Sequence, residues 1–467
     1  MGAMNSRRQW RARIESVIRN DPASRPMTEA LLSIDEVYAR KVIDLAMRIG
    51  EALIAVGASA NEVVLAVIRV AAALGIKPVH VDISYNSIGV SYHRNEIELP
   101  FTLIRVVRAP VPDHTKLQQL QALVADIESG RVALDDARVR FHKIRRLPFP
   151  YRPAVIVAAQ GALALGVGVL YGADWLNLLI IVLAACAAAL TQRILSRWHV
   201  PFFFSQAAGA LAVVAFAAVA NWFEDLGVPL FVDIRPTVIV AAGIVLMLAG
   251  MSVVAAAQDA IDGFALTAGG RILDLALLTA GVAIGIIGGV AITQALGIGI
   301  PLASDPPALG PAWMQVVGAI LIAVTVAIWN GAGMRTIAVS AVLGTIAWVT
   351  YSAVALAGVG FAAASFFGAL LASFVGTLIA HRLHVPSIAV TTAAIVPMVP
   401  GSMVFRGILA VVEAESDPQA LMAGLAELVG ASAIGIALAS GASLGLFLGA
   451  PLRDTLQSVV RRRGRIR

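Results

Sequence analysis

The part of the chain after residue 152 is almost free of charge, and this restricts the fold more than any other feature. Residues 153–452 contain 7 Arg, no Lys and 12 acidic residues, whereas residues 1–152 hold 22 of the 35 basic and 16 of the 29 acidic residues. A soluble fold could not cover its surface with so few charges. The distribution excludes a single globular enzyme, a disordered protein and a nucleic-acid-binding protein. It predicts a soluble N-terminal domain followed by a polytopic membrane domain.

Ten apolar stretches after residue 152 are candidate transmembrane helices, because about 20 apolar residues can cross a bilayer as a helix. They cover approximately residues 154–171, 175–192, 202–221, 236–256, 272–296, 313–329, 336–356, 361–380, 387–412 and 428–450. The sequence therefore predicts an α-helical polytopic membrane protein with about ten transmembrane helices.

The charges between these stretches predict which side of the membrane each loop faces. With a cytoplasmic N-terminus, 11 basic residues fall in the inner loops and tail, among them Arg271, Arg335 and Arg382. Most acidic residues then fall in the outer loops, and Arg235 is the only basic residue beside one of them. This agrees with the positive-inside rule. We therefore expect both termini to be cytoplasmic, which requires an even number of spans.

Two of the stretches share a sequence pattern that indicates an internal repeat. Residues 236–250 and 386–401 both contain a Pro followed by Ile-Val-x-Met-x-x-Gly. These stretches are five spans apart, so they cross the membrane in opposite directions, which is typical of an inverted 5+5 repeat. A competing match, between residues 197–201 and 382–386, implies a parallel relation instead. We prefer the inverted repeat because it divides ten helices evenly.

The N-terminal part has the pattern of a small α+β domain. Helical spacing predicts one helix that ends near Gly57 and a second that ends near Gly75. The second helix opens with a capping box from Ser59 to Glu62. Alternating apolar residues then predict strands over about 79–92 and 101–108, before helices from Asp113 and over about 132–146. In order, we expect a basic mobile arm (1–34), a cytoplasmic α+β domain (35–150), membrane repeat one (151–300), and membrane repeat two with a basic tail (301–467).

A helix break is predicted in the ninth stretch. Pro397, Pro400 and Gly401 lie within it, and each proline removes a backbone donor. Freed N–H groups beside Ser402 suit a carboxylate, and transporters with inverted repeats bind substrate at such breaks. A simple proline kink is the alternative. Arg406 follows by one turn and either binds a carboxylate or extends towards the outer surface.

Further polar residues are candidates for the same pathway. Gly250 occupies the matched position in the first repeat, and Gln206 is a weaker candidate to line the pore. A second group follows the fourth stretch and is a candidate for proton coupling or ammonium binding. It comprises Asp259, Asp262, Arg271 and Asp274. A solvated inner loop with an Asp–Arg pair is the alternative for this group.

The N-terminal domain offers Glu62, Asp82 and Asn86 as candidate ligand-binding residues. Asp82 and Asn86 lie close together around a break between strands, where they can bind a polar group. A solvated or structural role is the simpler interpretation. The spacing of Asp82 with the nearby histidines matches no metal-ligand pattern, and Cys186 is the only cysteine, so we expect no metal site and no cofactor.

In the order of its motifs the chain resembles the threonine/serine exporter family. The resemblance covers about residues 36–450. It rests on Leu45-Ala-x-Arg-Ile-Gly50, Gly57-Ala-Ser-x-x-Glu62, His80-Val-Asp-Ile-Ser-Tyr-Asn86, Leu248-Ala-Gly-Met-Ser, Gln258-Asp259, Arg271, Pro397-Met-Val-Pro-Gly401 and Arg406-Gly407. It implies a non-enzymatic secondary transporter that exports L-threonine and L-serine across the bacterial inner membrane, driven by the proton-motive force. The family carries over no agreed site residues.

The expected partners are a small amino acid, protons and the lipid bilayer, without nucleic acid. The glycine-rich face of Gly435, Gly441 and Gly445 leaves open packing against a second protomer. Two alternative functions remain open at this point. One is a transporter of another small solute, and the other is a membrane-anchored sensor or hydrolase that acts through the N-terminal domain.

Overall fold

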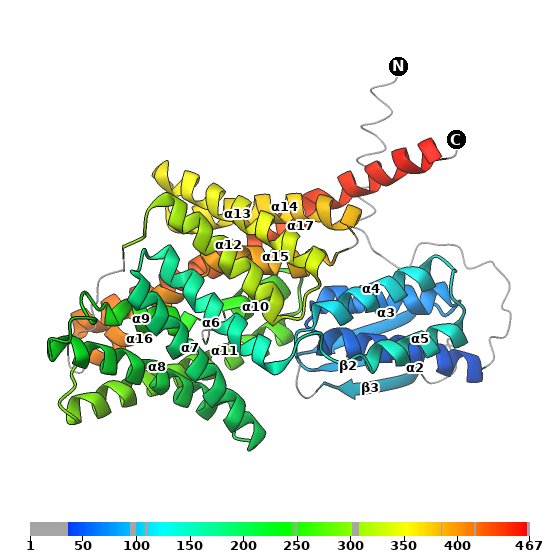
Figure 1. The fold of residues 1–467 in the computed structure, drawn as a ribbon. Coiled ribbons are helices and arrows are strands. Elements are labelled where there is room, and N and C mark those ends of the chain that lie inside the picture. The colour runs from blue at the N-terminus through cyan, green and yellow to red at the C-terminus, as the bar shows by residue number, and fades with distance from the viewer. Residues whose placement is uncertain are drawn as a thin grey trace. The chain divides into compact units, whose positions relative to one another are not determined.

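The chain is mostly helical, with one small sheet near its N-terminus (Figure 1). The computed structural model describes residues 36–464 apart from 94–99, 108–110, 246, 248–249, 301–307, 384 and 415–416. The predicted arm of residues 1–34 lies outside the described residues. From Val42 onward the chain forms one compact unit.

The first helices and strands begin and end where turn and capping residues predict. They are α2 (Glu36–Ala55), α3 (Ala60–Ala73), β1 (Val79–Ser84), β2 (Ser87–Tyr92), β3 (Phe101–Val106), α4 (His114–Glu128) and α5 (Leu134–Arg145). Gly57 and Gly75 follow α2 and α3 with φ angles of 92° and 86°, which a residue with a Cβ rarely adopts. The Ser59 hydroxyl accepts from the N–H of Glu62 at 3.3 Å and caps α3.

The sheet is antiparallel, with β2 between β1 and β3. Ile88, Val90 and Tyr92 of β2 are buried, and they alternate with half-buried residues as a one-sided sheet requires. Gly50 of α2 lies so close to Ile88 and to Val67 of α3 that a Cβ would come within 2.7 Å of both. The buried face of the sheet therefore packs against α2 and α3.

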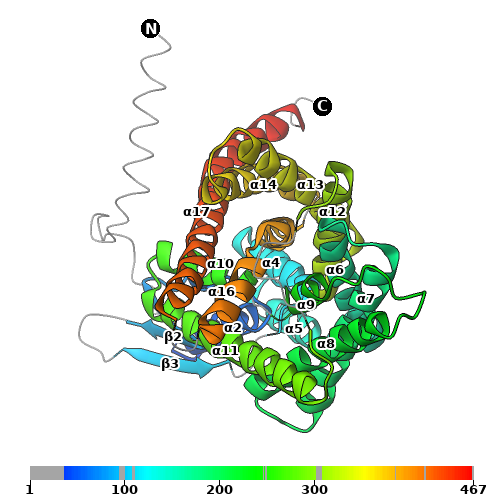
Figure 2. The same cartoon turned by 90° about the vertical axis from the view of Figure 1, so that its left-hand side faces the viewer.

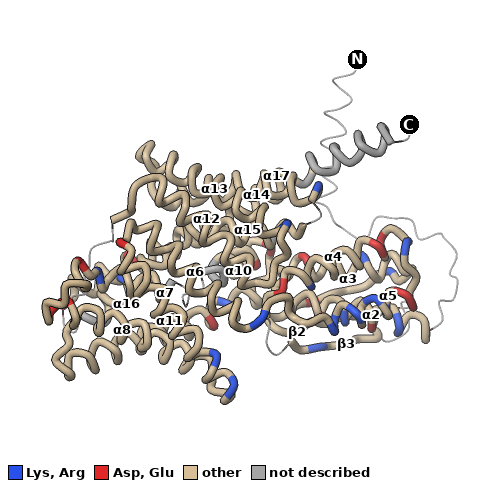
Figure 3. Tube along the Cα trace, viewed as in Figure 1, with Lys and Arg blue, Asp and Glu red and all other residues tan. Residues whose placement is uncertain are grey.

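The remaining helices carry few charges along their lengths (Figure 3). They are α6 (Pro153–Leu170), α7 (Trp175–Arg197), α8 (Phe202–Asp225), α9 (Pro236–Val245), α10 (Gly250–Ile261), α11 (Ala265–Ala295), α12 (Ala312–Trp329), α13 (Met334–Leu356), α14 (Phe361–Leu383), α15 (Ser387–Ile395), the 3-10 helix η1 (Val396–Met398), α16 (Gly401–Glu413) and α17 (Pro418–Gly464). Among the described residues, eight helices are long and apolar enough to cross a membrane, and the bent pair α15–α16 makes up to nine. The chain is a multi-pass membrane protein.

The count of ten spans stays a prediction, because the candidate over 236–256 is divided between α9 and α10. These helices have 10 and 12 residues, so each alone is shorter than a span requires. Helix α9 ends at Val245 and α10 begins at Gly250, the glycine that the sequence pattern matches to Gly401. Helix α16 begins at Gly401 after the break in the ninth stretch.

Helices of the two predicted repeats have corresponding neighbours (Figure 2). In the first half, α6 contacts α7, α7 contacts α8, and α11 contacts both α8 and α10. In the second half, α12 contacts α13, α13 contacts α14, and α17 contacts both α14 and α16. The short helix α9 packs on α6, α7 and α8, as α15 packs on α12, α13 and α14. This correspondence supports the predicted repeat, whose inverted symmetry stays a prediction.

Glycines bring two of these helix pairs into backbone contact. A Cβ on Gly285 of α11 would overlap the carbonyl oxygen of Ala207 in α8, and one on Gly441 of α17 would overlap that of Phe366 in α14. Gly445 likewise lies against the Leu370 carbonyl oxygen. The glycine face of α17 therefore packs against α14 within the chain. The expectation that this face joins a second protomer stays untested.

Candidate functional site

The ninth predicted span is interrupted at its prolines. Helix α15 ends at Ile395, η1 holds Pro397, and the chain leaves helical geometry at Pro400 (φ −79°, ψ 52°) before α16 begins at Gly401. The axes on the two sides of the break differ by 51°. Since proline has no N–H and clashes with the preceding turn, two prolines three positions apart explain the break. The break presents the first N–H groups of α16, which attract negative charge.

Ser402 and Arg406 lie four positions apart and therefore share one face of α16. The Tyr171 side chain, at the end of α6, interacts with both of them. Arg406 is 8% exposed, and its Nη2 lies 3.1 and 3.2 Å from the two carboxylate oxygens of Glu427 in α17. Its Nη1 is buried and has no hydrogen-bond partner among the described residues. The arrangement thus holds an unused guanidinium donor close to the start of a half-helix.

The sequence reasoning did not single out Glu427 or Tyr171. Glu427 carried a signal, because it is a lone acid flanked by apolar residues directly before the tenth stretch, and ionisable residues within membrane helices mark functional sites. Tyr171 carried none, since its place beside Ser402 depends on the packing of helices more than 200 residues apart in the chain. The ion pair also bears on the two alternatives for Arg406. Its side chain binds an acid of the next helix and does not extend to the surface.

The candidates after the fourth stretch are only partly brought together. Asp259 of α10 is 1% exposed, and its carboxylate lies 2.8 Å from Nε of Arg271 in α11. The backbone N–H of Ala60, at the start of α3, also donates to Asp259 at 3.4 Å. Asp262 and Asp274 are exposed and interact instead with Asn61 and with the Tyr85 hydroxyl. Asp262 also lies within electrostatic range of Asp259. The Asp259–Arg271 pair and Asp262 therefore lie together, whereas Asp274 interacts with the N-terminal region, and the role given to this group stays a prediction.

Gly250 and Gln206 lie at different places in the first half. Gly250 begins α10, directly after the gap between α9 and α10. Gln206 of α8 is buried, and its side-chain oxygen accepts a hydrogen bond from Gln192 of α7 at 2.8 Å. Within the described residues, no hydrogen bond or ion pair joins either position to α16, so they stay separate predictions.

The N-terminal candidates do not form one site in the described part of the chain. Asp82 is exposed and accepts from the Ser84 hydroxyl, whereas the Asn86 carbonyl accepts from the N–H of Val107. The Glu62 carboxylate accepts from Gln121 of α4 rather than closing the predicted capping box on Ser59. Burial raises the pKa of Glu62. Within the described residues, no group of three His, Cys, Asp or Glu side chains could hold a metal ion.

The region before α6 contacts loops from both halves of the membrane helices. The Thr267 hydroxyl of α11 accepts from the N–H of Tyr85 at 3.1 Å. After α12, the carbonyl oxygens of Asn330 and Gly331 accept from the N–H of His114 and the hydroxyl of Thr115, at 2.8 and 2.6 Å. The helix end that carries Arg271 therefore lies next to the sheet, and the one that carries Arg335 lies next to α4.

Family models and individual relatives that match this chain all carry the same family description. The sequence model of the threonine/serine exporters matches residues 44–293, and a second one, described as "Threonine/Serine exporter, ThrE", matches residues 315–448. A Mycobacterium tuberculosis protein named "Probable threonine/serine exporter" is 34% identical over 90% of this chain and 78% of its own length. The "Threonine/serine exporter" of Corynebacterium glutamicum is 27% identical over 95% of this chain and 90% of its own. No solved structure matches. By these matches, which cover the soluble region and both halves of the membrane helices, the chain belongs to the threonine/serine exporter family.

Proposed function

We propose that this protein exports L-threonine and L-serine across the bacterial inner membrane, driven by the proton-motive force, with both termini in the cytoplasm. Its family consists of proteins named as amino-acid exporters, and two relatives carry that name. The observation that carries the proposal is the break before α16, where a buried arginine keeps a donor unused. An amino acid offers the carboxylate that this donor lacks.

The substrate's carboxylate binds Nη1 of Arg406 and the free N–H groups at the start of α16. Both are positive and attract a carboxylate, and Nη1 is buried without a hydrogen-bond partner among the described residues. Glu427, which is half-exposed and already faces Arg406, then accepts the substrate's ammonium group. The hydroxyls of Ser402 and Tyr171 lie beside Arg406 and can bind the side-chain hydroxyl that threonine and serine share.

The pair of Asp259 and Arg271 couples transport to protons. Asp259 is buried and held by one guanidinium and one backbone N–H, so its protonation weakens both contacts at once. This would release α10 from α11 and from the start of α3. Opening of the inner side then follows uptake of a proton, whereas the Arg406–Glu427 pair responds to substrate.

The contacts of the N-terminal region support the proposed orientation. The loops with Arg271 and Arg335 are assigned to the inner side by charge alone. Both meet the same soluble region, through Thr267 and through Gly331. A soluble region can meet both loops only if they lie on one side of the membrane.

Amino-acid efflux from bacterial cells tests the proposal. Cells that express the chain are loaded with a threonine-containing dipeptide, and external threonine is followed with and without a protonophore. We expect protonophore-sensitive efflux above that of the empty vector, and a parallel result for serine. Efflux equal to the empty vector for all small amino acids, from protein shown to be inserted, would reject this substrate class.

A further inference from the structure

A cleft of about 600 Å³ lies among α2, α4 and α5, outside every site discussed above. This volume is within the range of pockets that bind small molecules. Its apolar wall includes Ala52 of α2, Val107 after β3, and Leu120 and Phe141 of α4 and α5. Ala52 contributes only a methyl group, which leaves space that a larger side chain would fill. The described residues that line the cleft also include five charged side chains.

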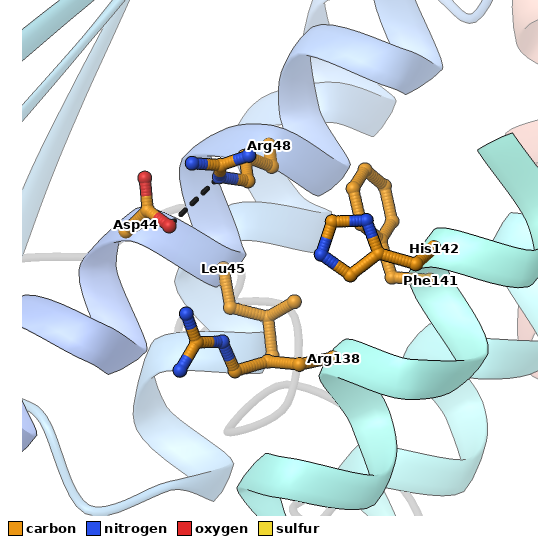
Figure 4. Close-up of a pocket in the computed structure, with 6 residues that line it drawn as sticks. All are labelled: Asp44, Leu45, Arg48, Arg138, Phe141 and His142. Carbon is orange, nitrogen blue, oxygen red and sulfur yellow. Dashed lines mark hydrogen bonds and ion pairs between the residues drawn. The ribbon is translucent and has the colours of Figure 1, made fainter.

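Two of these charges are already compensated by neighbours. Asp44 binds Nε of Arg48 at 2.7 Å and a guanidinium nitrogen of Arg105 at 3.2 Å, and Arg105 binds Glu51 at 3.2 Å. This network joins α2 to β3. A hollow of only about 50 Å³ lies beside Asp44, with Arg48, Arg138 and His142 turned towards it (Figure 4). It has room for a few waters but not for an organic ligand.

Asp113, which pairs electrostatically with Lys116, still has one oxygen without a hydrogen bond, and Arg145 has no ion-pair partner among the described residues. Asp113 is 3% exposed, and its Oδ1 caps α4 by accepting from the N–H of Lys116 at 2.9 Å. Its Oδ2 is buried and accepts no hydrogen bond from any described residue. The Lys116 ammonium lies 3.6 Å from it, beyond hydrogen-bond distance. Arg145 is exposed at the end of α5 and has no ion pair within the described part of the chain.

We propose that this cleft binds an α-amino acid with an apolar side chain. The ammonium group donates to Oδ2 of Asp113, the carboxylate binds Arg145, and the side chain packs on Ala52, Val107 and Phe141. A buried acceptor without a partner is destabilising, so a ligand that donates to it gains binding energy. A carboxylate without an ammonium group leaves Oδ2 of Asp113 without a hydrogen bond, and an amine without a carboxylate leaves Arg145 unpaired. The cleft therefore selects a zwitterion over either half.

The cleft is placed where its occupancy can influence the membrane helices. His114 and Thr115, which follow Asp113, bind the carbonyl oxygens of Asn330 and Gly331 between α12 and α13. Phe149, which lines the cleft, is so close to Gly331 that a Cβ there would lie 2.9 Å from its ring. A ligand that holds Asp113 and Phe149 also holds this loop. The binding itself does not depend on what the membrane helices transport, whereas its effect on efflux rests on the proposed function.

Equilibrium dialysis of the full-length protein in detergent, with labelled L-leucine as the probe, tests the binding. We expect saturable binding that unlabelled leucine displaces and that isocaproate and leucinamide displace far less. Asp113→Asn keeps the helix cap but removes the charge, and it should weaken leucine binding by about tenfold or more. Ala52→Leu fills the cleft and should abolish binding. Glu128→Gln, which removes an exposed acid at the end of the same helix, should bind as the unmodified protein does.

Two results would overturn the proposal. One is the absence of saturable leucine binding by folded full-length protein. The other is binding that Asp113→Asn and Ala52→Leu leave unchanged, which would place the leucine elsewhere, for example at Arg406. Threonine efflux from proteoliposomes, with and without leucine on the side of the N-terminal region, is the second measurement. If leucine changes the rate of threonine efflux and Ala52→Leu removes that change, the result supports coupling between the cleft and the membrane helices. If the unmodified protein binds leucine but transports no threonine, the result contradicts the transport proposal and leaves the leucine-binding proposal intact.

Discussion

The two halves of the membrane helices have corresponding helix neighbours, and each half holds one ion pair in which the signs of the charges are reversed. In each half a short helix resumes at a glycine after a break, and one of its residues forms an ion pair with the long helix that follows. In α10 this residue is Asp259, paired with Arg271, and in α16 it is Arg406, paired with Glu427. In both pairs the short helix supplies the buried partner, 1% and 8% exposed, and the long helix the half-exposed one, at 30% and 34%.

This difference shows that packing and chemistry are specified by separate residues. Glycines at Gly285 and Gly441 set the approach of the long helices in the two halves. In the proposed mechanism, single ionisable residues then decide what each half binds. The first pair is satisfied by the N–H of Ala60, whereas the second keeps Nη1 of Arg406 unused. One half is suited to respond to a proton and the other to bind an anion.

The largest effect is expected from Arg406→Gln, which removes the donor that distinguishes the second half. Since Glu427 then keeps a half-buried charge without its partner and the carboxylate loses its site, threonine efflux should fall about 100-fold or more. Efflux from proteoliposomes measures this. The double variant with Arg406→Glu and Glu427→Arg re-forms the pair but not the anion site. Restored efflux in that variant would mean that the pair is only structural.

The glycines test whether the two halves really share their packing. Gly285→Leu and Gly441→Leu each place a side chain against a carbonyl oxygen of the neighbouring helix, and each should destabilise the fold by about 2 kcal/mol. Gly288→Leu, on the same helix as Gly285, meets nothing within 4 Å and serves as the control. Thermal unfolding in detergent is the measurement. A clear loss in one half only would break the correspondence.

Asp259→Asn tests the proton role given to the first half. The variant keeps the shape of the side chain but cannot gain or lose a proton, so net efflux driven by a proton gradient should fall about tenfold. Exchange of labelled for unlabelled threonine should persist, because substrate binding at Arg406 is intact. Asp274→Asn, an exposed acid on α11, is the matched control. Full proton-driven efflux in a variant with both Asp259→Asn and Asp262→Asn would exclude the assignment.

A smaller effect on stability is expected at the two contacts that join the soluble region to the membrane helices. We call them anchors: Tyr85 with Thr267 in the first half, and His114 with Asn330 in the second. Burial lowers the pKa of His114, beside the second half, from 6.5 to about 4. The folded protein therefore binds this proton less readily than the unfolded chain. The stability contribution is complete above about pH 6.5 and is lost as the pH falls towards about 4.

The melting temperature at about pH 7.5 and about pH 5 measures this contribution. The decrease in melting temperature from the higher to the lower pH should be a few degrees smaller in His114→Asn than in the unmodified protein. The anchor of the first half is insensitive in this range, since burial raises the pKa of Tyr85 to about 12. An equal decrease in melting temperature at the lower pH in both proteins would show that the His114 anchor is no more sensitive to pH than the Tyr85 anchor.

Local features of the fold were predictable because their causes are local. Gly57 and Gly75 follow helices, Ser59 caps one, and the prolines before Gly401 interrupt another. The three strands and the long apolar helices follow from period and length alone. The tenth span and the inverted symmetry are not settled by these signals.

The site could be predicted only in part because its remaining contacts join distant residues. Arg406 and Asp259 stood out as charges within or beside apolar stretches, but their partners depend on how helices pack. Tyr171 beside Ser402 and Gln121 beside Glu62 are contacts of this kind. The predicted grouping of Asp259 with Asp262 and Asp274 relied on sequence proximity, and it did not indicate that Asp274 interacts with Tyr85 of the N-terminal region, while Asp262 stays within electrostatic range of Asp259.

The contact between α6 and α12 determines which parts can move. Gly166 and Gly318 face each other there, and a Cβ on Gly318 would lie 2.6 Å from the Gly166 carbonyl oxygen. The N–H of Gly310 donates to Leu170 at one end, and the Tyr151 hydroxyl donates to Ala332 at the other. Two backbones this close, tied at both ends, cannot slide past each other without breaking these bonds. In the proposed transport cycle we therefore expect α6 and α12 to move as one unit.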